Sequence, residues 1–449
     1  MLEPVHAEPG TVVIVGAGVA GLAAAQHLTR AGVRTLVLEA ASGVGGRMST
    51  EKVDGFRVDR IGPLLSTSYP ELRRTPGLDG LALRPFSPGV LVHSEGRRHR
   101  AGEPVGPRRA RGALSAARAL ASAPRPARGV RPPLGGPLDH ARLGAALARI
   151  AATPPARLLA RPELPISRAL SERGLPSRTL HGFIRPLLSA LLCDPDLTTS
   201  SRCAELALHA YAKGRLAVPE GGADALPELL ASGLPPGTVH TGVRVTAVAA
   251  NHVTTAEHGE LPCSGVVLAT DALAAAALLP GLRVPGFHPV TVVHHAAPEP
   301  PLAEAALLLD ADRLGPVAHT SVISQVDPSR APAGRALISS TVLGPPPGDR
   351  ELRAQLAALY GTSTCRWETL AVHHDAHAVP AMPAPHDPRR PVRLLDGLYV
   401  CGDHRDTSTV QGALHSGRRA ARAVLTDLGV PAAASPASGE EETPVHEAA

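Results

Sequence analysis

The sequence predicts an α/β fold, in which a Rossmann-type dinucleotide-binding domain is interleaved with a second α+β substrate-binding domain. Three observations predict it. A glycine-rich turn joins an apolar strand to a helix near the N-terminus, a second strand, turn and helix follow near the C-terminus, and helical and strand-rich stretches alternate between them. The 449 residues suffice for at least two domain-sized units.

The N-terminal stretch reads as a βαβ unit, with strands at residues 11–15 and 35–39 around a helix at residues 20–29. Gly16, Gly18 and Gly21 form G-x-G-x-x-G in the first turn. The first glycine permits the turn, the second lets the backbone approach a diphosphate, and the third permits close helix packing. Glu39 ends the next strand, where a carboxylate accepts hydrogen bonds from ribose hydroxyls.

A lone glycine motif does not distinguish NAD from FAD. The choice between these dinucleotides therefore depends on the C-terminal motif. Residues 398–421 read as a strand, a turn at Gly402 and Asp403, and the start of a helix over residues 411–428. A helix N-terminus at this place would stabilise an anion through its partial positive charge. The two distant motifs therefore predict one site built from both ends of the chain.

The order of these motifs, with Gly45-Gly46-Arg47 and the segment GFRVDRIG at residues 55–62, resembles the flavin amine oxidase-like superfamily. That superfamily includes phytoene desaturases and protoporphyrinogen oxidases. The resemblance implies FAD as cofactor, with Arg47 at the diphosphate or flavin edge, Asp403 at the ribityl and phosphate region, and Val245 at the adenine. It also directs the start of the last helix at the flavin N1/O2 edge, where reduced flavin carries negative charge. The residues expected to bind FAD are Gly16, Gly18, Gly21, Glu39, Gly46, Arg47, Val245, Gly402, Asp403, Val410, Gln411 and Gly412.

The two domains are expected to be discontinuous in sequence. A stretch at residues 96–155, rich in Arg, Ala, Pro and Gly and without aromatic residues, indicates a helical insertion with loops and helical patches at 113–123 and 138–152. The tail is rich in Ala, Pro, Ser and Glu, which is typical of disorder. We therefore expect an FAD domain at residues 1–85, 205–285 and 390–430, a substrate domain at 86–204 and 286–389, and a disordered tail at 431–449.

The motifs favour hydride transfer to flavin N5, for which the protein mainly positions a substrate C–H and excludes water. Amine oxidases of the superfamily usually add a lysine that is water-bridged to N5 and aromatic side chains near the C-terminal motif. This chain has no lysine after Lys213 and no aromatic residue from Cys401 onward, and only 2% of its residues are aromatic. We expect an FAD-dependent oxidoreductase that dehydrogenates (desaturates) or isomerises a mainly apolar small molecule in an aliphatic pocket.

Three alternatives stay open: an amine oxidase with an atypical pocket, a protoporphyrinogen oxidase-like enzyme, and a catalytically degenerate flavin-binding protein. No catalytic residue is assigned, and neither is the electron acceptor. A metal site is not expected, because only Asp375 accompanies the strand-borne histidines, one of which could instead shuttle a proton. Those histidines are His294, His295, His373, His374 and His377.

Partners and location follow from composition. An arginine cluster lacks the aromatic residues that stack on bases, so nucleic acid binding is not expected; peripheral contact with anionic lipid is the alternative to a solvated surface. No apolar run reaches the roughly 20 residues that span a bilayer, and no secretory signal precedes the first strand, so we expect a cytoplasmic protein. Five cysteines without a CxxC pair indicate reduced, mostly buried thiols. The cluster comprises Arg97, Arg98, Arg100, Arg108, Arg109 and Arg111.

Overall fold

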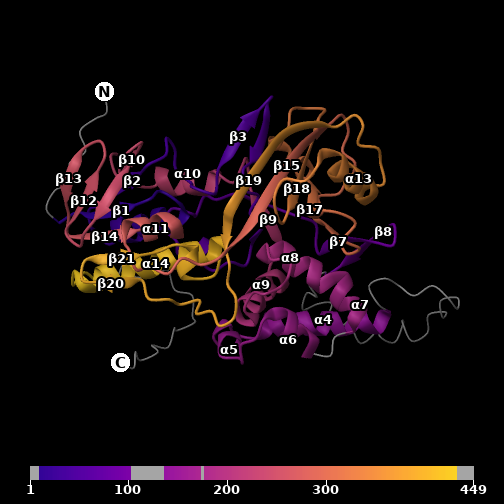
Figure 1. Ribbon diagram of the computed structural model, residues 1–449, viewed down its shortest axis with the longest axis horizontal. Coiled ribbons are helices and arrows are strands. Elements are labelled where there is room, and N and C mark those ends of the chain that lie inside the picture. Colours follow the sequence, from indigo (N-terminus) through magenta and orange to yellow (C-terminus); the bar gives the residue numbers. More distant parts are fainter. Residues whose placement is uncertain (1–9, 103–135, 173–175, 432–449) are drawn as a thin grey trace.

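The computed structural model describes residues 10–102, 136–172 and 176–431. Figure 1 shows an elongated molecule with one sheet at each end of its long axis and a helical layer beside the second sheet. The predicted α/β class, with a parallel sheet and a second α+β region, is confirmed.

The first sheet contains five parallel strands and one antiparallel edge strand. Its central strands are buried along their whole length, which is typical of a parallel sheet covered on both faces. Three distant parts of the sequence supply these strands. Their spatial order is β10 (Val239–Thr241), β2 (Thr35–Glu39), β1 (Val12–Val15), β14 (Gly265–Leu268), β21 (Leu398–Val400) and β20 (Arg393–Leu395).

Side chains alternate across this sheet, and each face has its own cover. Val12 and Ile14 of β1 belong to a core shared with the helices, whereas Val13 and Val15 face the opposite core. The helices on the first face are α1 (Val19–Arg30), α10 (Ala225–Ser232) and α14 (Val410–Asp427). A small antiparallel sheet contributes to the second core, with strands β11 (Val245–Val248), β12 (His252–Thr255) and β13 (Gly259–Pro262). Helix α11 (Ala272–Leu278) follows β14.

The second sheet has seven strands, all antiparallel to their neighbours except the parallel pair β16 and β7. Aliphatic side chains of its strands pack on α13 (Asp349–Tyr360) on one face. The spatial order is β19 (Glu368–Pro380), β15 (Phe287–Ala297), β18 (Ala336–Val342), β17 (Val317–Val322), β16 (Leu308–Asp310), β7 (Val90–Ser94) and β8 (Arg97–Ala101).

A helical layer packs beside this sheet (Figure 1). One of its helices contains a π-helical turn, η1, which runs directly into α8. The layer comprises α4 (Pro137–Ala152), α5 (Pro155–Leu159), α6 (Ile166–Glu172), α7 (Ser177–Thr179), η1 (Leu180–Ile184), α8 (Arg185–Leu192) and α9 (Ser201–Lys213).

Short elements connect the two ends of the molecule. Strands β3 (Thr50–Val53) and β4 (Phe56–Asp59) form a hairpin, and β9 (Leu216–Pro219) lies between β5 (Leu65–Ser66) and β6 (Leu83–Pro85). The remaining short helices are α2 (Glu71–Arg74), α12 (Ile323–Val326), η2 (Pro328–Arg330) and η3 (Asp403–Arg405).

Two details differ from the sequence expectations. The stretch expected to be a helical insertion begins with strand β8, because Glu95 and Gly96 take left-handed φ angles of 51° and 72° and close a hairpin with β7. Val245, which was expected within the FAD domain, begins β11 of the separate antiparallel sheet, whereas the short strand β10 joins β2 of the parallel sheet. The patch at 138–152 is α4; the patch at 113–123 and residues 432–449 of the tail lie outside the described residues, and the domain boundaries stay predictions.

Candidate functional site

A cavity of about 650 Å³ lies where the carboxyl ends of the parallel strands meet the N-termini of α1 and α14. Gly16 and Gly18 line it from the first turn, and Asp403 and Val410 line it from the C-terminal motif. Parallel α/β sheets place their ligands at this edge. The fold therefore brings the two distant motifs into one cavity.

The three glycines of the first turn meet different surroundings. Gly16 has φ of 107°, and a Cβ atom there would lie 2.9 Å from the Ala269 carbonyl oxygen. A Cβ atom on Gly21 would lie 2.1 Å from the Gly16 carbonyl oxygen, so close backbone packing requires glycine at both positions. A Cβ atom on Gly18 would meet nothing within 4 Å. That open space at the start of α1 fits a bound diphosphate.

The carboxylate of Glu39 is held at the end of β2 by two backbone groups. Its Oε2 accepts a hydrogen bond from the Ala17 amide at 2.8 Å, and its Oε1 accepts one from the Ala41 amide at 2.8 Å. A carboxylate has about four acceptor positions, so each oxygen can also accept a ribose hydroxyl. Val245 lines the same cavity from the start of β11. This end of the cavity thus fits the adenosine half of a dinucleotide.

Arg47 connects three parts of the chain. Its Nη2 donates to Asp403 Oδ1 at 2.6 Å, and its Nη1 donates to the Ala378 carbonyl oxygen on β19 at 2.7 Å. Burial by itself lowers the pKa of this guanidinium, but Asp403, with smaller contributions from Asp375 and Asp271, outweighs burial and raises the pKa above its ordinary value. Arg47 is therefore a fixed cation in the cavity wall, as an anionic cofactor group requires.

The C-terminal turn is shaped by close contacts. Gly402 has φ of 141°, and a Cβ atom there would lie 2.5 Å from the His404 ring. Its amide donates to Ser416 Oγ of α14 at 2.9 Å, which fixes the turn against the helix. Asp403 follows directly and faces the cavity. This arrangement places the Asp403 carboxylate beside Arg47.

The start of α14 contributes less to the cavity wall than expected. The Thr409 side chain caps the helix by accepting from the Gly412 amide at 3.1 Å, and a Cβ atom on Gly412 would lie 1.9 Å from the Thr407 carbonyl oxygen. Gln411 Oε1 accepts from the Glu71 amide at 3.1 Å. Gln411 and Gly412 thus have packing contacts, and only Val410 of the three lines the cavity. The remaining lining residues from the expected set are Gly16, Gly18, Glu39, Gly46, Arg47, Val245, Gly402 and Asp403.

The other end of the cavity is aliphatic. We call it the aliphatic chamber, and its side chains come from the loop after β4, the end of α8, β15 and β19. The described cavity wall includes no lysine, and Tyr69 is its one phenolic or indole ring. The chamber comprises Ile61, Leu64, Ala190, Leu191, Val290, Ala378 and Val379.

Sequence reasoning missed a polar pair in the same wall. His319 of β17 and Thr341 of β18 face each other in register, and both line the cavity. The His319 side chain is buried, and its Nδ1 has no hydrogen-bond partner within the described chain. Burial lowers its pKa to about 4, so the imidazole is neutral at pH 7. The only signal in the sequence was a histidine in a short strand of alternating apolar and polar residues. Many histidines with a purely structural role occur in the same pattern.

The histidines singled out from the sequence have other contacts. His294 Nε2 lies 2.8 Å from the Asp59 carbonyl oxygen, and burial lowers its pKa to about 4. His374 Nδ1 lies 2.9 Å from Thr291 Oγ1. Among the described residues, no group of three or more His, Cys, Asp or Glu side chains is placed to hold a metal ion.

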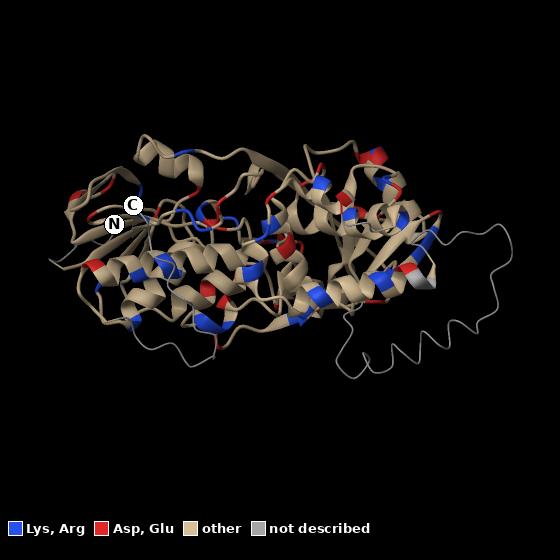
Figure 2. Ribbon diagram, turned by 90° about the horizontal axis from the view of Figure 1, so that it is seen from below, with Lys and Arg blue, Asp and Glu red and all other residues tan. Residues whose placement is uncertain are grey.

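The basic cluster lies partly on an edge strand. Arg97, Arg98 and Arg100 belong to β8, and Arg100 bonds to Glu304 and to the Pro88 carbonyl oxygen. Figure 2 shows basic and acidic residues interspersed over both halves of the described chain. None of the described helices is long and apolar enough to cross a membrane. The other members, Arg108, Arg109 and Arg111, lie outside the described residues.

The thiols are less buried than the sequence suggested. Cys203 and Cys401 are buried, Cys193 and Cys263 are partly buried, and Cys365 is exposed, because it lies in the loop after α13. Burial raises the pKa of the Cys401 thiol to about 12. Although Cys401 precedes the Gly402 turn, its thiol is therefore protonated and unreactive.

Comparisons with known proteins agree with this geometry. The family model for flavin containing amine oxidoreductases matches residues 19–425. Pseudooxynicotine dehydrogenase from Pseudomonas sp is 43% identical over 60 residues, which are 13% of this chain and 12% of that protein. The zeta-carotene-forming phytoene desaturase of Myxococcus xanthus is 40% identical over 92 residues, 19% of this chain and 18% of the relative. The matched stretches thus span less than a fifth of these relatives.

Two solved structures share the fold over nearly the whole chain. An oxidoreductase from Methanosarcina mazei superposes with a TM-score of 0.67 at 16% identity, covering 91% of this chain and 98% of that one. Cyclohexylamine oxidase from Brevibacterium oxydans IH-35A gives a TM-score of 0.63 at 18% identity, covering 93% and 99%. With the family match across most of its length, the chain belongs to the flavin-containing amine oxidoreductases and is an FAD-dependent oxidoreductase.

Proposed function

We propose that this protein dehydrogenates or isomerises a mainly apolar small molecule held in the aliphatic chamber. The observation that carries the proposal is the composition of the chamber wall. Ile61, Leu191, Val290 and Val379 supply branched aliphatic surface, and none of the chamber side chains is charged. Apolar contact of this kind binds a ligand through its hydrocarbon surface.

Different residues of the cavity would hold the cofactor and orient the substrate. The open space at Gly18, the carboxylate of Glu39 and the guanidinium of Arg47 would hold FAD, which supplies the hydride acceptor when bound. The chamber excludes water from the substrate and fixes its orientation. The neutral imidazole of His319 and the hydroxyl of Thr341 can each donate or accept one hydrogen bond, so they would orient a single polar group or double bond of the substrate.

The same wall disfavours an ammonium substrate. Moving a cation out of water is costly unless a carboxylate or several acceptors compensate, and the chamber side chains offer no carboxylate. The chain also lacks a lysine in the described cavity wall. Amine oxidation, the activity in the name of one structural neighbour, is therefore the less favoured reaction.

The test is anaerobic reduction of the FAD-loaded protein, followed as loss of absorbance near about 450 nm. Phytoene, as an unsaturable apolar probe, should bleach the flavin, whereas putrescine and cyclohexylamine should not. Leu191→Glu in the chamber should slow bleaching at least about tenfold at unchanged flavin content, because it buries a charge. Leu273→Glu on exposed α11 is the matched control and should leave the rate unchanged. Bleaching by the amines alone would contradict the proposal, and flavin inert to every donor would indicate a degenerate enzyme.

A further inference from the structure

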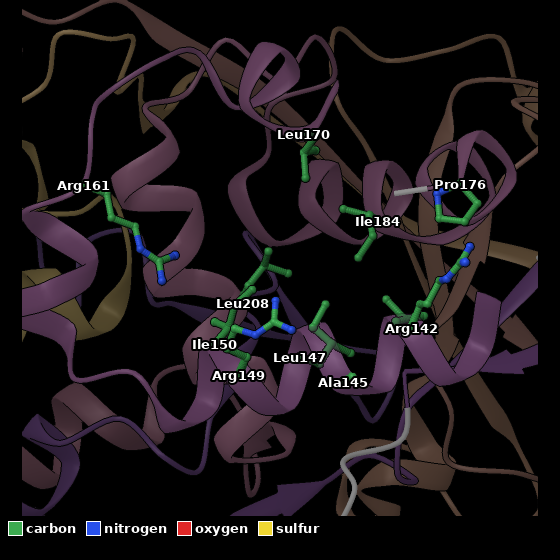
Figure 3. Close-up of a pocket in the computed structure, with 12 residues that line it drawn as sticks. Arg142, Ala145, Leu147, Arg149, Ile150, Arg161, Leu170, Pro176, Ile184 and Leu208 are labelled. Atoms are coloured by element: carbon green, nitrogen blue, oxygen red, sulfur yellow. The ribbon is translucent and has the colours of Figure 1, made fainter. Parts of the chain in front are cut away.

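A second cavity, of about 580 Å³, lies inside the helical layer between α4, α6, η1 and α9. Figure 3 shows leucine and isoleucine side chains around it. We call the cavity of about 650 Å³ described above the flavin cavity. The second cavity shares no described lining residue with it and is therefore a separate compartment. The apolar lining comprises Leu143, Leu147, Ile150, Leu170, Ile184 and Leu208.

Three arginines line this apolar cavity, and two of them lie next to carboxylates. Arg161 is paired with Glu205 at 2.8 Å, and Arg142 lies 3.8 Å from Asp139. Arg149 is an exposed residue of α4 with no carboxylate partner within the described chain, and Figure 3 shows its side chain beside the leucine and isoleucine side chains of the cavity. One solvent-accessible guanidinium at the cavity mouth thus lacks a carboxylate partner and is available to an anionic group.

We propose that this cavity binds an amphiphile with one straight aliphatic chain and one carboxylate. The volume lies within the roughly 300–1,000 Å³ of ordinary ligand pockets, and the leucine and isoleucine side chains provide the surface that a hydrocarbon chain requires. The planar guanidinium of Arg149 matches a carboxylate through two parallel hydrogen bonds. A neutral head group makes weaker bonds there, and a cationic one is repelled.

The site lies on the helix that also borders the flavin cavity. Ile184 of η1 lines the helical cavity, whereas Ala190 and Leu191 near the end of α8 line the aliphatic chamber. Leu187 and Leu188 lie between them along the helix and are fully buried. The two cavities therefore have separate walls.

The first experiment uses the full chain loaded with FAD and a fluorescent probe, 11-(dansylamino)undecanoate. Decanoate should displace the probe with a stoichiometry of one, decanol at least about tenfold less tightly, and decyltrimethylammonium not at all. Arg149→Gln should weaken decanoate about tenfold and leave decanol unchanged. Arg168→Gln is the control, because Arg168 is exposed on α6 and does not line the cavity. Equal affinities for decanoate and decanol would overturn the proposal.

A second pair of variants locates the bound chain. Ala146→Phe adds a ring to the cavity wall and should abolish binding of both decanoate and decanol. Ala148→Phe adds the same ring on the exposed side of α4 and should bind normally. Flavin absorbance reports folding and the flavin site in both variants. Unchanged binding in Ala146→Phe, or loss of bound flavin whenever the probe binds, would place the probe elsewhere and overturn the proposal. Self-association that Ala146→Phe alone abolishes would assign the cavity to a second copy of the chain instead.

Discussion

At the scale of single residues, the glycines of the first turn separate folding from cofactor binding. Gly21 is required by backbone contact within the βαβ unit, whereas the space beside Gly18 is free of protein atoms. The sequence pattern predicted all three glycines but could not show which one faces open space. Gly16 in turn is restricted by the backbone of Ala269, which lies about 250 residues further along the chain.

The Gly18→Ala and Gly21→Ala variants should therefore behave differently. We expect Gly18→Ala to lose most of its bound FAD, because the methyl group occupies the diphosphate space, while the apoprotein keeps its stability. Gly21→Ala should lower the free energy of unfolding of the apoprotein by about 3 kcal/mol, since the added carbon overlaps the Gly16 carbonyl. Flavin absorbance and chemical denaturation measure the two effects. Full FAD retention by Gly18→Ala would refute the diphosphate assignment.

The histidine of the cavity wall shows where prediction at the scale of single residues failed. Five other histidines stood out in the sequence because they are adjacent or clustered, yet His294 bonds to the backbone of Asp59. His319 is isolated in sequence and faces the cavity only because β17 lies next to β18. The position of a polar side chain relative to a cavity depends on sheet register, which a single strand does not reveal.

At the scale of elements, α1 and α14 come from opposite ends of the chain and pack in direct contact. A Cβ atom on Gly417 of α14 would lie 2.3 Å from the Ala20 carbonyl oxygen of α1. Both helices point their N-termini at the flavin cavity, since Gly18 and Val410 line it. The close crossing at Gly417 therefore sets the distance between the two halves of the cofactor site.

Gly417→Ala tests that role. We expect it to push α14 away from α1, to lower the free energy of unfolding by about 2 kcal/mol and to weaken FAD retention. Gly43→Ala is the control, because a Cβ atom at Gly43 meets nothing within 4 Å and the residue lies in an exposed loop. Thermal unfolding with and without added FAD measures both effects. Normal flavin content in Gly417→Ala would contradict the assignment of this crossing to the site.

Elements with strong local patterns were predicted well, and short ones were not. Strands β1 and β2 and helices α1 and α14 follow apolar periodicity and agree with the prediction within one or two residues. Strand β10 has three residues and depends on β2 for its conformation, and β8 is so rich in arginine that its sequence favours a solvated surface. Such strands are determined by their partners rather than by their own propensity.

At the scale of the whole molecule, a buried ion pair connects segments far apart in sequence. Arg330 is 1% exposed and donates to both carboxylate oxygens of Asp59, at 2.9 and 2.7 Å. Asp59 also accepts from the Ala223 amide at 2.9 Å, next to α10. The partners are separated by 271 residues, so the GFRVDRIG segment was evident in the sequence while its pairing with Arg330 was not.

Arg330→Met should destabilise the protein more than the same substitution at any surface arginine. Removal of the guanidinium leaves the Asp59 carboxylate buried without its cation, which costs about 3 to 5 kcal/mol of unfolding free energy. Arg335→Met is the matched control, because Arg335 pairs with Glu368 on the surface and its loss should cost less than about 1 kcal/mol. Urea denaturation of the two variants provides the comparison, and equal midpoints would show that the buried pair contributes nothing specific.

The strand order of the first sheet also bears on biosynthesis. Strand β1 at residues 12–15 has β14 as a neighbour, and β14 in turn needs β21 at residues 398–400. At a synthesis rate of about 5 to 20 residues per second, the first strands would leave the ribosome roughly 20 to 80 seconds before the last one. During that interval the nascent chain exposes unpaired apolar strand edges and lacks the Asp403 half of its cofactor site. FAD can thus be retained only after the residues of β21 and the Asp403 turn have been synthesised.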